Sequence, residues 1–134
     1  MVVFNPFKRM SAKKKILIVE DEESLAKALQ TKFTEEGFEC SVARNGDEGI
    51  EKMLEAKPDL IILDILMPFK DGLTFLDECN QNSLCESIPV IVLTNLSDTQ
   101  KVSQAVEKGV REYLVKADWG ISDIAKKANE LLDE

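Results

Sequence analysis

The sequence contains no histidine at all among its 134 residues. Histidine-based metal sites, histidine general bases and Ser-His-Asp or Cys-His catalysis are therefore excluded. If the chain handles phosphoryl groups, any phosphohistidine must belong to a partner protein. Aromatic residues make up only 6% of the chain and hydrophobic residues 44%. Aliphatic side chains must therefore build the core, and the chain length fits one domain.

Cysteine is also scarce. The three cysteines, Cys40, Cys79 and Cys85, form no Cys-x-x-Cys pair, and their number is odd. This pattern favours buried or half-buried thiols in a reducing compartment over a disulfide framework or a zinc site.

Long apolar runs are missing as well. No stretch of about 18 apolar residues occurs, so we expect no membrane insertion. The N-terminal segment lacks the apolar region and small-residue cleavage site of a secretion signal. We therefore expect a cytoplasmic chain. Residues 1–14 are predicted to be a flexible, basic N-terminal extension, serving either as a solvated tail or as a docking segment, and residues 15–134 to form one domain.

Positive charge is in deficit. Lys and Arg number 17 against 25 Asp and Glu, which gives a formal net charge of −8. Proteins that bind nucleic acid need a basic face to contact phosphates, so we expect no direct nucleic-acid binding.

Three short apolar runs predict buried strands. They lie at 16–19, 60–63 and 90–93, and each is continuous rather than alternating and rich in β-branched residues. Such runs are typical of strands buried on both faces of a parallel sheet. Two weaker strands fit residues 39–43 and 112–115.

Helical patterns lie between and after these strands. Capping signals at Asn45 and Asp71 mark two helix starts, and Gly37 and Gly109 mark two helix ends. The first helix is expected to bury Leu25, Ala28, Leu29 and Phe33. The strand–helix alternation, repeated five times, predicts an α/β fold with a parallel sheet and helices on both faces.

Polar residues follow four of the predicted strands. Glu20 and Asp21 come after the first strand, Asp64 after the third, Thr94 at the end of the fourth and Lys116 after the fifth. Open α/β sheets bind ligands at the carboxyl ends of their strands, near the point where the strand order reverses. A strand order of 2-1-3-4-5 would bring all five residues to one edge.

The acidic residues at this edge need compensating positive charge. Two like charges about 4 Å apart cost about 4 kcal/mol at an effective dielectric near 20. A divalent cation with oxygen ligands would offset this cost, and Mg²⁺ keeps waters that phosphate oxygens can replace. Lys116 would add a further positive charge. This set of residues indicates a phosphoryl-transfer site with Asp64 as the nucleophile.

The sequence resembles the receiver domains of two-component response regulators, the family of the single-domain chemotaxis protein. The resemblance rests on the segments ILIVEDE (16–22), DLIILDILMP (59–68) with DG (71–72), PVIVLT (89–94) and EYLVK (112–116). It implies a flavodoxin-like, doubly wound sheet of five parallel strands in the order 2-1-3-4-5, with five helices.

The resemblance also implies roles for the acidic residues. Asp64 would accept a phosphoryl group. Mg²⁺ (or Mn²⁺) would be held by Glu20, Asp21, Asp64 and the backbone carbonyl of Leu66. The donor would be the phosphohistidine of a sensor histidine kinase or a histidine phosphotransfer protein.

The remaining roles concern switching. Thr94 would hydrogen-bond the phosphoryl group, Lys116 would pair with it, and Tyr113 would turn inward behind Thr94 on activation. The surface formed by the fourth helix, fifth strand and fifth helix, roughly 99–132, would then bind a downstream protein partner or a second copy of the chain in a phosphorylation-linked homodimer. The chain is expected to be a regulator rather than an enzyme, although it would catalyse its own phosphorylation and its own dephosphorylation, the latter slowly.

The slow dephosphorylation is expected from two apolar residues. Leu66 and Leu96 would flank the site and leave few polar side chains to orient an attacking water, so we expect phosphate to be lost slowly from Asp64.

Two positions depart from the family's usual pattern. One is Asn95, which stands beside Thr94 where the family favours a small residue and could crowd or screen the site; the other is Ala117. Ala117 follows the lysine where the family usually has a cis-linked proline. A cis bond to a residue other than proline costs about 3–4 kcal/mol, so either that strain is accommodated or the loop 117–120 runs differently. Ala117 supports an alternative function, a degenerate receiver that binds proteins without phosphorylation. A Mg²⁺-dependent phosphatase with an Asp nucleophile is less favoured, because Leu66 stands where a second Asp is needed.

Overall fold

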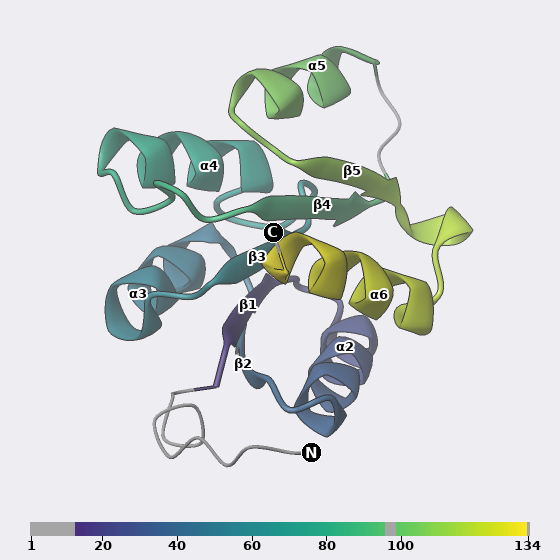
Figure 1. Cartoon of the computed structure of the whole chain (residues 1–134). Coiled ribbons are helices and arrows are strands. Elements are labelled where there is room, and N and C mark those ends of the chain that lie inside the picture. The colour runs from purple at the N-terminus through teal and green to yellow at the C-terminus, as the bar shows by residue number, and fades with distance from the viewer. Residues whose placement is uncertain (1–12, 96–98, 134) are drawn as a thin grey trace.

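Continuous apolar runs in the sequence form the strands of a central sheet. The computed structural model describes residues 13–95 and 99–133, and within them the strands alternate with helices (Figure 1). The elements are β1 (Lys15–Val19), α2 (Glu23–Glu35), β2 (Glu39–Ala43), α3 (Gly46–Ala56), β3 (Leu60–Leu63), α4 (Gly72–Gln81), β4 (Val90–Thr94), α5 (Thr99–Glu107), β5 (Glu112–Val115), a 3₁₀ turn η1 (Lys116–Asp118) and α6 (Ile121–Leu132).

The five strands are all parallel and lie in the order β2-β1-β3-β4-β5. The predicted fold class and strand order are therefore confirmed. The strand order reverses at β1, because β2 lies on one side of it and β3 on the other. β1 and β3 pair from Ile16 with Leu60 to Val19 with Leu63. This register aligns the carboxyl ends of the two strands that carry the predicted acidic residues.

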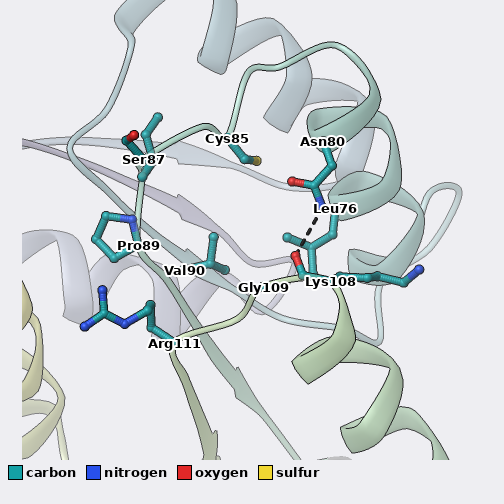
Figure 2. A pocket seen from close by; sticks show the side chains of 10 residues that line it. Leu76, Asn80, Cys85, Ser87, Pro89, Val90, Lys108, Gly109 and Arg111 are labelled. Carbon is teal, nitrogen blue, oxygen red and sulfur yellow. Dashed lines mark hydrogen bonds between the residues drawn. The ribbon is translucent and has the colours of Figure 1, made fainter.

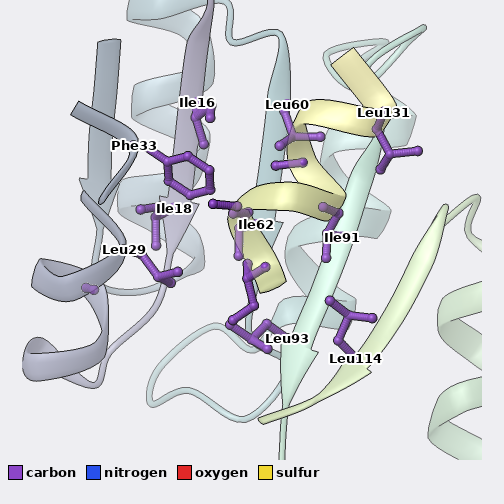
Figure 3. Close-up of a cluster of buried hydrophobic side chains, with 14 residues drawn as sticks. Ile16, Ile18, Leu29, Phe33, Leu60, Ile62, Ile91, Leu93, Leu114 and Leu131 are labelled. Atoms are coloured by element: carbon purple, nitrogen blue, oxygen red, sulfur yellow. The ribbon is translucent and has the colours of Figure 1, made fainter. Parts of the chain in front are cut away.

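Helices cover both faces of the sheet. On one face, α2 and α6 bury Leu29, Phe33 and Leu131 against strand residues such as Ile18 and Ile62 (Figure 3). On the other face, α3 and α4 pack on β1 and β3, and α5 contributes Ala105 to a third cluster with Val92. The core is mainly aliphatic, as the low aromatic content predicted.

The predicted caps at two helix starts are confirmed. The side chain of Asn45 accepts a hydrogen bond from Glu48 N–H at 3.0 Å and donates one to the Glu48 carboxylate at 3.4 Å. The side chain of Asp71 accepts a hydrogen bond from Thr74 N–H at 2.8 Å at the start of α4. Gly37 and Gly109 follow helices with φ angles of 94° and 92°, a backbone conformation that glycine adopts without strain.

Two predictions about the core are wrong. In α2 the buried face carries Ala26, whereas Ala28 is exposed, because the helix presents positions 26, 29 and 33 to the sheet. Cys79 and Cys85 are also not thiols but form a disulfide. The chain folds back after α4, with Leu84 N–H donating to the Cys79 carbonyl, and this brings the two Cα atoms within 5.4 Å. Cys40 remains a free thiol, as expected.

Residues 1–12, most of the predicted N-terminal extension, lie outside the described residues, so its flexibility and its boundary at residue 14 stay predictions. Within 13–95 and 99–133, no helix combines the length and the apolar character needed to cross a membrane.

Candidate functional site

The predicted site residues meet at the carboxyl edge of the sheet. Glu20 and Asp21 follow β1, Asp64 follows β3, Thr94 ends β4 and Lys116 follows β5. All of them except Glu20 lie, with neighbouring residues, in the wall of a pocket of about 260 Å³. The pocket is lined by Asp21, Glu22, Asp64, Leu66, Thr94, Asn95 and Lys116.

Three carboxylates converge beside this pocket. One carboxylate oxygen from each of Glu20, Asp21 and Asp64 lies within 4.8 Å of the others. Glu20 and Asp64 are buried, with 3% and 4% of their surface exposed, whereas Asp21 is exposed. Three hard oxygen donors at this spacing, one of them open to solvent, suit a cation such as Mg²⁺ that keeps part of its water shell.

Lys116 supplies the positive charge that these carboxylates need. Its ammonium nitrogen lies 2.8 Å from Glu20 Oε1, 3.1 Å from Asp64 Oδ2 and 3.4 Å from Glu22 Oε2. The lysine side chain is only 13% exposed. The remaining oxygens of the buried acids accept backbone hydrogen bonds, Glu20 from Glu22 N–H at 3.0 Å and Asp64 from Leu66 N–H at 3.3 Å.

Burial and charge pairing shift two pKa values at the site. Burial raises the pKa of Glu20 from 4.5 to about 7, although hydrogen bonds from Lys116 and from Glu22 N–H oppose this rise. Burial would lower the pKa of Lys116, but its hydrogen bonds to Glu20 and Asp64 outweigh that effect and raise the pKa above its ordinary value. Lys116 therefore stays positively charged at neutral pH, whereas Glu20 is close to its titration point.

The two predicted switch residues lie on neighbouring strands. Thr94 is fully buried at the end of β4. Tyr113 on β5 pairs with Val92, two residues before Thr94, and packs half-buried against a cluster of Ile65, Leu73, Val92 and Ala105. Tyr113 therefore lies beside the strand that carries Thr94, between β4 and the helix α5.

The segment after Asp64 closes tightly onto the start of α4. Gly72 N–H donates to the Ile65 carbonyl at 2.9 Å. A Cβ atom at Gly72 would lie only 2.3 Å from the Asp64 carbonyl oxygen and 2.8 Å from the Ile65 Cα. Only glycine therefore lets α4 approach the backbone of Asp64 this closely.

The loop after Lys116 shows what Ala117 does in place of the family's usual proline. Among the described residues no peptide bond is cis, so the Lys116–Ala117 bond is trans. The chain forms the 3₁₀ turn η1, and Trp119 packs against the core cluster that α6 covers. Lys116 nevertheless reaches both Glu20 and Asp64, so Ala117 leaves its contacts with the acidic residues in place.

One residue that contacts Lys116 was not predicted. Glu22 lies on the loop before α2, and its carboxylate is the third acidic group near the lysine. The acidic run Glu20-Asp21-Glu22 was visible in the sequence, but nothing in it indicated that the third acid would point back to the site.

A second pocket lies at the opposite end of the sheet. It has a volume of about 290 Å³, and Figure 2 shows Pro89 and Arg111, which precede β4 and β5, at its wall. The side chain of Asn80 donates to the Lys108 carbonyl at 3.1 Å across it. Because this pocket is at the amino ends of the strands, it is separate from the acidic site.

An open parallel sheet with an acidic, lysine-paired pocket at its carboxyl edge defines a regulatory α/β domain of the chemotaxis-regulator type. The model of the response regulator receiver domain matches residues 16–129. The chain belongs to this family.

Relatives among characterised proteins support the assignment. Response regulator ArlR of Staphylococcus aureus (strain USA300) is 37% identical over 101 residues, which are 75% of this chain and 45% of that protein. The probable transcriptional regulator ycf27 of Guillardia theta is 36% identical over 107 residues, 80% of this chain and 41% of that protein. The chain thus spans less than half the length of these relatives.

Solved structures agree with the fold. The receiver domain of the Francisella response regulator 1452 matches with a TM-score of 0.80 and 28% identity, over 90% of this chain and 98% of that one. The chemotaxis protein CheY4 of Vibrio cholerae matches with a TM-score of 0.81 and 26% identity, over 89% and 98% of the two chains. The chain is therefore a regulatory receiver domain of two-component signalling.

Proposed function

We propose that this receiver domain is a phosphorylation-activated switch whose phosphoacceptor is Asp64. The observation that carries the proposal is the convergence of Glu20, Asp21 and Asp64 within 4.8 Å, with Lys116 bound to two of them. The three carboxylates would hold a divalent cation, and that cation together with Lys116 would supply the positive charge that a transferred phosphoryl group needs.

In the proposed reaction, a carboxylate oxygen of Asp64 attacks the phosphorus of a phosphohistidine on a sensor histidine kinase or a histidine phosphotransfer protein. A P–O bond to Asp64 forms, and the P–N bond breaks with its electron pair returning to the imidazole nitrogen of the donor. Lys116 holds the Asp64 carboxylate and pairs with the phosphoryl oxygens. Glu20, Asp21, Asp64 and the Leu66 carbonyl would hold Mg²⁺, which supplies further charge neutralisation when bound.

Phosphorylation of Asp64 would change the positions of Thr94 and Tyr113. The added negative charge and acceptor oxygens favour a hydrogen bond from the Thr94 hydroxyl. Movement of Thr94 toward the phosphoryl group leaves space beside β4, which Tyr113 fills from β5. The resulting population shift changes the surface of α5, β5 and α6, where a downstream protein partner or a second copy of the chain binds.

The two alternative functions have less support. A degenerate receiver without phosphorylation would not need a lysine held between two buried carboxylates, and Lys116 keeps both contacts despite Ala117. A phosphatase with an Asp nucleophile needs a second acid two residues later, and that position holds Leu66, an apolar side chain that is 56% exposed.

The test is intact mass after incubation with acetyl phosphate and Mg²⁺. The wild type should gain one phosphoryl group, and Asp64→Asn or the addition of EDTA should abolish the gain. Asp123 is exposed in α6 and does not line the pocket, so Asp123→Asn serves as a matched control that keeps the gain. A wild type that gains no phosphoryl group, with Mg²⁺ binding also absent, would contradict the proposal and favour the degenerate receiver instead.

A further inference from the structure

The loop that follows Asp64 is held at a residue that does not line the acidic pocket. This segment, residues 65–71, is called the acceptor loop here; it carries Leu66, whose carbonyl is the proposed metal ligand. At its middle, Phe69 has a φ of 68° and is 93% exposed. A residue other than glycine in this left-handed region is strained, and such a conformation persists only where the surroundings hold it.

Lys70, next to Phe69, makes the contacts that hold this part of the loop. Its ammonium nitrogen lies 2.8 Å from Asp47 Oδ1 in α3 and 2.7 Å from Glu78 Oε2 in α4. Its backbone carbonyl accepts a hydrogen bond from Gly46 N–H at 3.1 Å. One residue thus links the acceptor loop to two helices at three points.

The aliphatic part of the Lys70 side chain is also closely packed. A Cβ atom at Gly46 would lie 2.5 Å from Lys70 Cγ, so the lysine stem fills the space that glycine leaves at the start of α3. The Lys70 side chain is only 18% exposed. Hydrogen bonds to Asp47 and Glu78 raise its pKa, so the ammonium stays charged at neutral pH.

We propose that Lys70 is a positioning residue for the phosphoacceptor site. By tying the acceptor loop to α3 and α4, it holds the Leu66 carbonyl and the Leu66 N–H that contacts Asp64 Oδ1 at 3.3 Å. A loop that is ordered before the cation binds does not lose conformational freedom at that moment, so binding is tighter. The inference rests on the proposed function, because it assigns Lys70 to the same metal and phosphoacceptor site.

The test compares Lys70→Met with Lys52→Met. Methionine keeps most of the stem of Lys70 but removes both ion pairs. Among the residues that the structure describes, Lys52 pairs with Glu55 alone, in its own helix and at 3.6 Å, so its replacement controls for the loss of a lysine. Lys70→Arg is the conservative variant, because the guanidinium group can contact both carboxylates.

Three measurements separate positioning from stability, all made well below the unfolding temperature of every variant. Amide hydrogen exchange without Mg²⁺ should be faster across residues 65–71 in Lys70→Met than in the wild type, with the strands unchanged. Calorimetric titration should show Mg²⁺ binding weakened about tenfold, the lower end of the effect for residues that support metal ligands. Phosphorylation by acetyl phosphate at saturating Mg²⁺ should return close to the wild-type rate, and Lys70→Arg should restore Mg²⁺ binding.

Each contrary outcome has a separate meaning. If the wild type binds Mg²⁺ and is phosphorylated, but Lys70→Met has the affinity of Lys52→Met and unchanged exchange in the loop, Lys70 has no positioning role while the proposed function stands. If the wild type neither binds Mg²⁺ nor accepts a phosphoryl group, the proposed function and the role of Lys70 are both overturned.

Discussion

The ammonium group of Lys116 lies 2.8 Å from the carboxylate of Glu20, a side chain that is only 3% exposed. This contact joins the ends of β1 and β5, which are not neighbours in the sheet. Even with the lysine beside it, Glu20 has a pKa raised to about 7, because burial disfavours its charged form.

The raised pKa of Glu20 predicts how stability depends on pH in the absence of metal. Between 4.5 and about 7 the folded chain binds a proton at Glu20 that the unfolded chain does not bind. This group therefore favours the folded state most below 4.5, and its contribution is lost as the pH rises through about 7. Melting in EDTA from about pH 5 to 8 should show the wild type losing stability relative to Glu20→Gln. Parallel melting curves across this range would contradict the assignment.

Replacement of Lys116, the positively charged residue of the site, should lower the stability of the fold more than replacement of one acidic residue. Lys116→Met would leave Glu20 and Asp64 buried without their shared partner, and we expect a loss of about 3 kcal/mol in the free energy of unfolding. Mg²⁺ should then stabilise the variant more than the wild type, since the ion replaces part of the lost charge. Chemical unfolding with and without Mg²⁺ measures both effects. Equal Mg²⁺ stabilisation of the two proteins would show that Lys116 and the ion do not share the same carboxylates.

Features that lie at strand ends could be predicted from the sequence, whereas contacts that depend on the path of loops could not. The strand order came from the family resemblance. Given that order, the convergence of Glu20, Asp64 and Lys116 could be predicted, because parallel strands present their carboxyl ends at one edge. The contact of Glu22 with Lys116 could not, since it depends on how the chain turns before α2. The two ion pairs of Lys70 also depend on the path of a loop, which local patterns do not determine.

Gly72 should tolerate no side chain. A Cβ atom there would meet the backbone of Asp64 and Ile65, which cannot move without shifting the phosphoacceptor. Gly72→Ala should cost about 2 kcal/mol in stability, as overpacking does, and slow phosphorylation by acetyl phosphate. At Gly120 a Cβ atom would lie 3.6 Å from its nearest neighbour, so Gly120→Ala is the matched control with a cost of at most about 1 kcal/mol. Equal losses in the two variants would contradict the close approach described for Gly72.

Leu66 predicts a long-lived phosphoryl group on Asp64. Its side chain is apolar, is 56% exposed and lines the pocket, so it offers no hydrogen bond to orient an attacking water. Leu96, which we expected to flank the site in the same way, lies outside the described residues. Leu66→Asn should speed the loss of phosphate severalfold, as followed by intact mass after removal of acetyl phosphate. Leu66→Ala is the control, and if it speeds the loss as much as asparagine does, shielding by the leucine rather than its lack of polarity is responsible.

The disulfide between Cys79 and Cys85 should contribute measurably to stability. The two residues are six positions apart, and closing so short a loop in the unfolded chain is expected to stabilise the fold by about 2 kcal/mol. Reduction of the wild type should lower its free energy of unfolding by this amount, whereas Cys79→Ala/Cys85→Ala should not respond to reductant. Alkylation after denaturation without reductant should label Cys40 alone, the one free cysteine. Labelling of all three cysteines in protein purified without reductant would instead restore the original expectation of thiols.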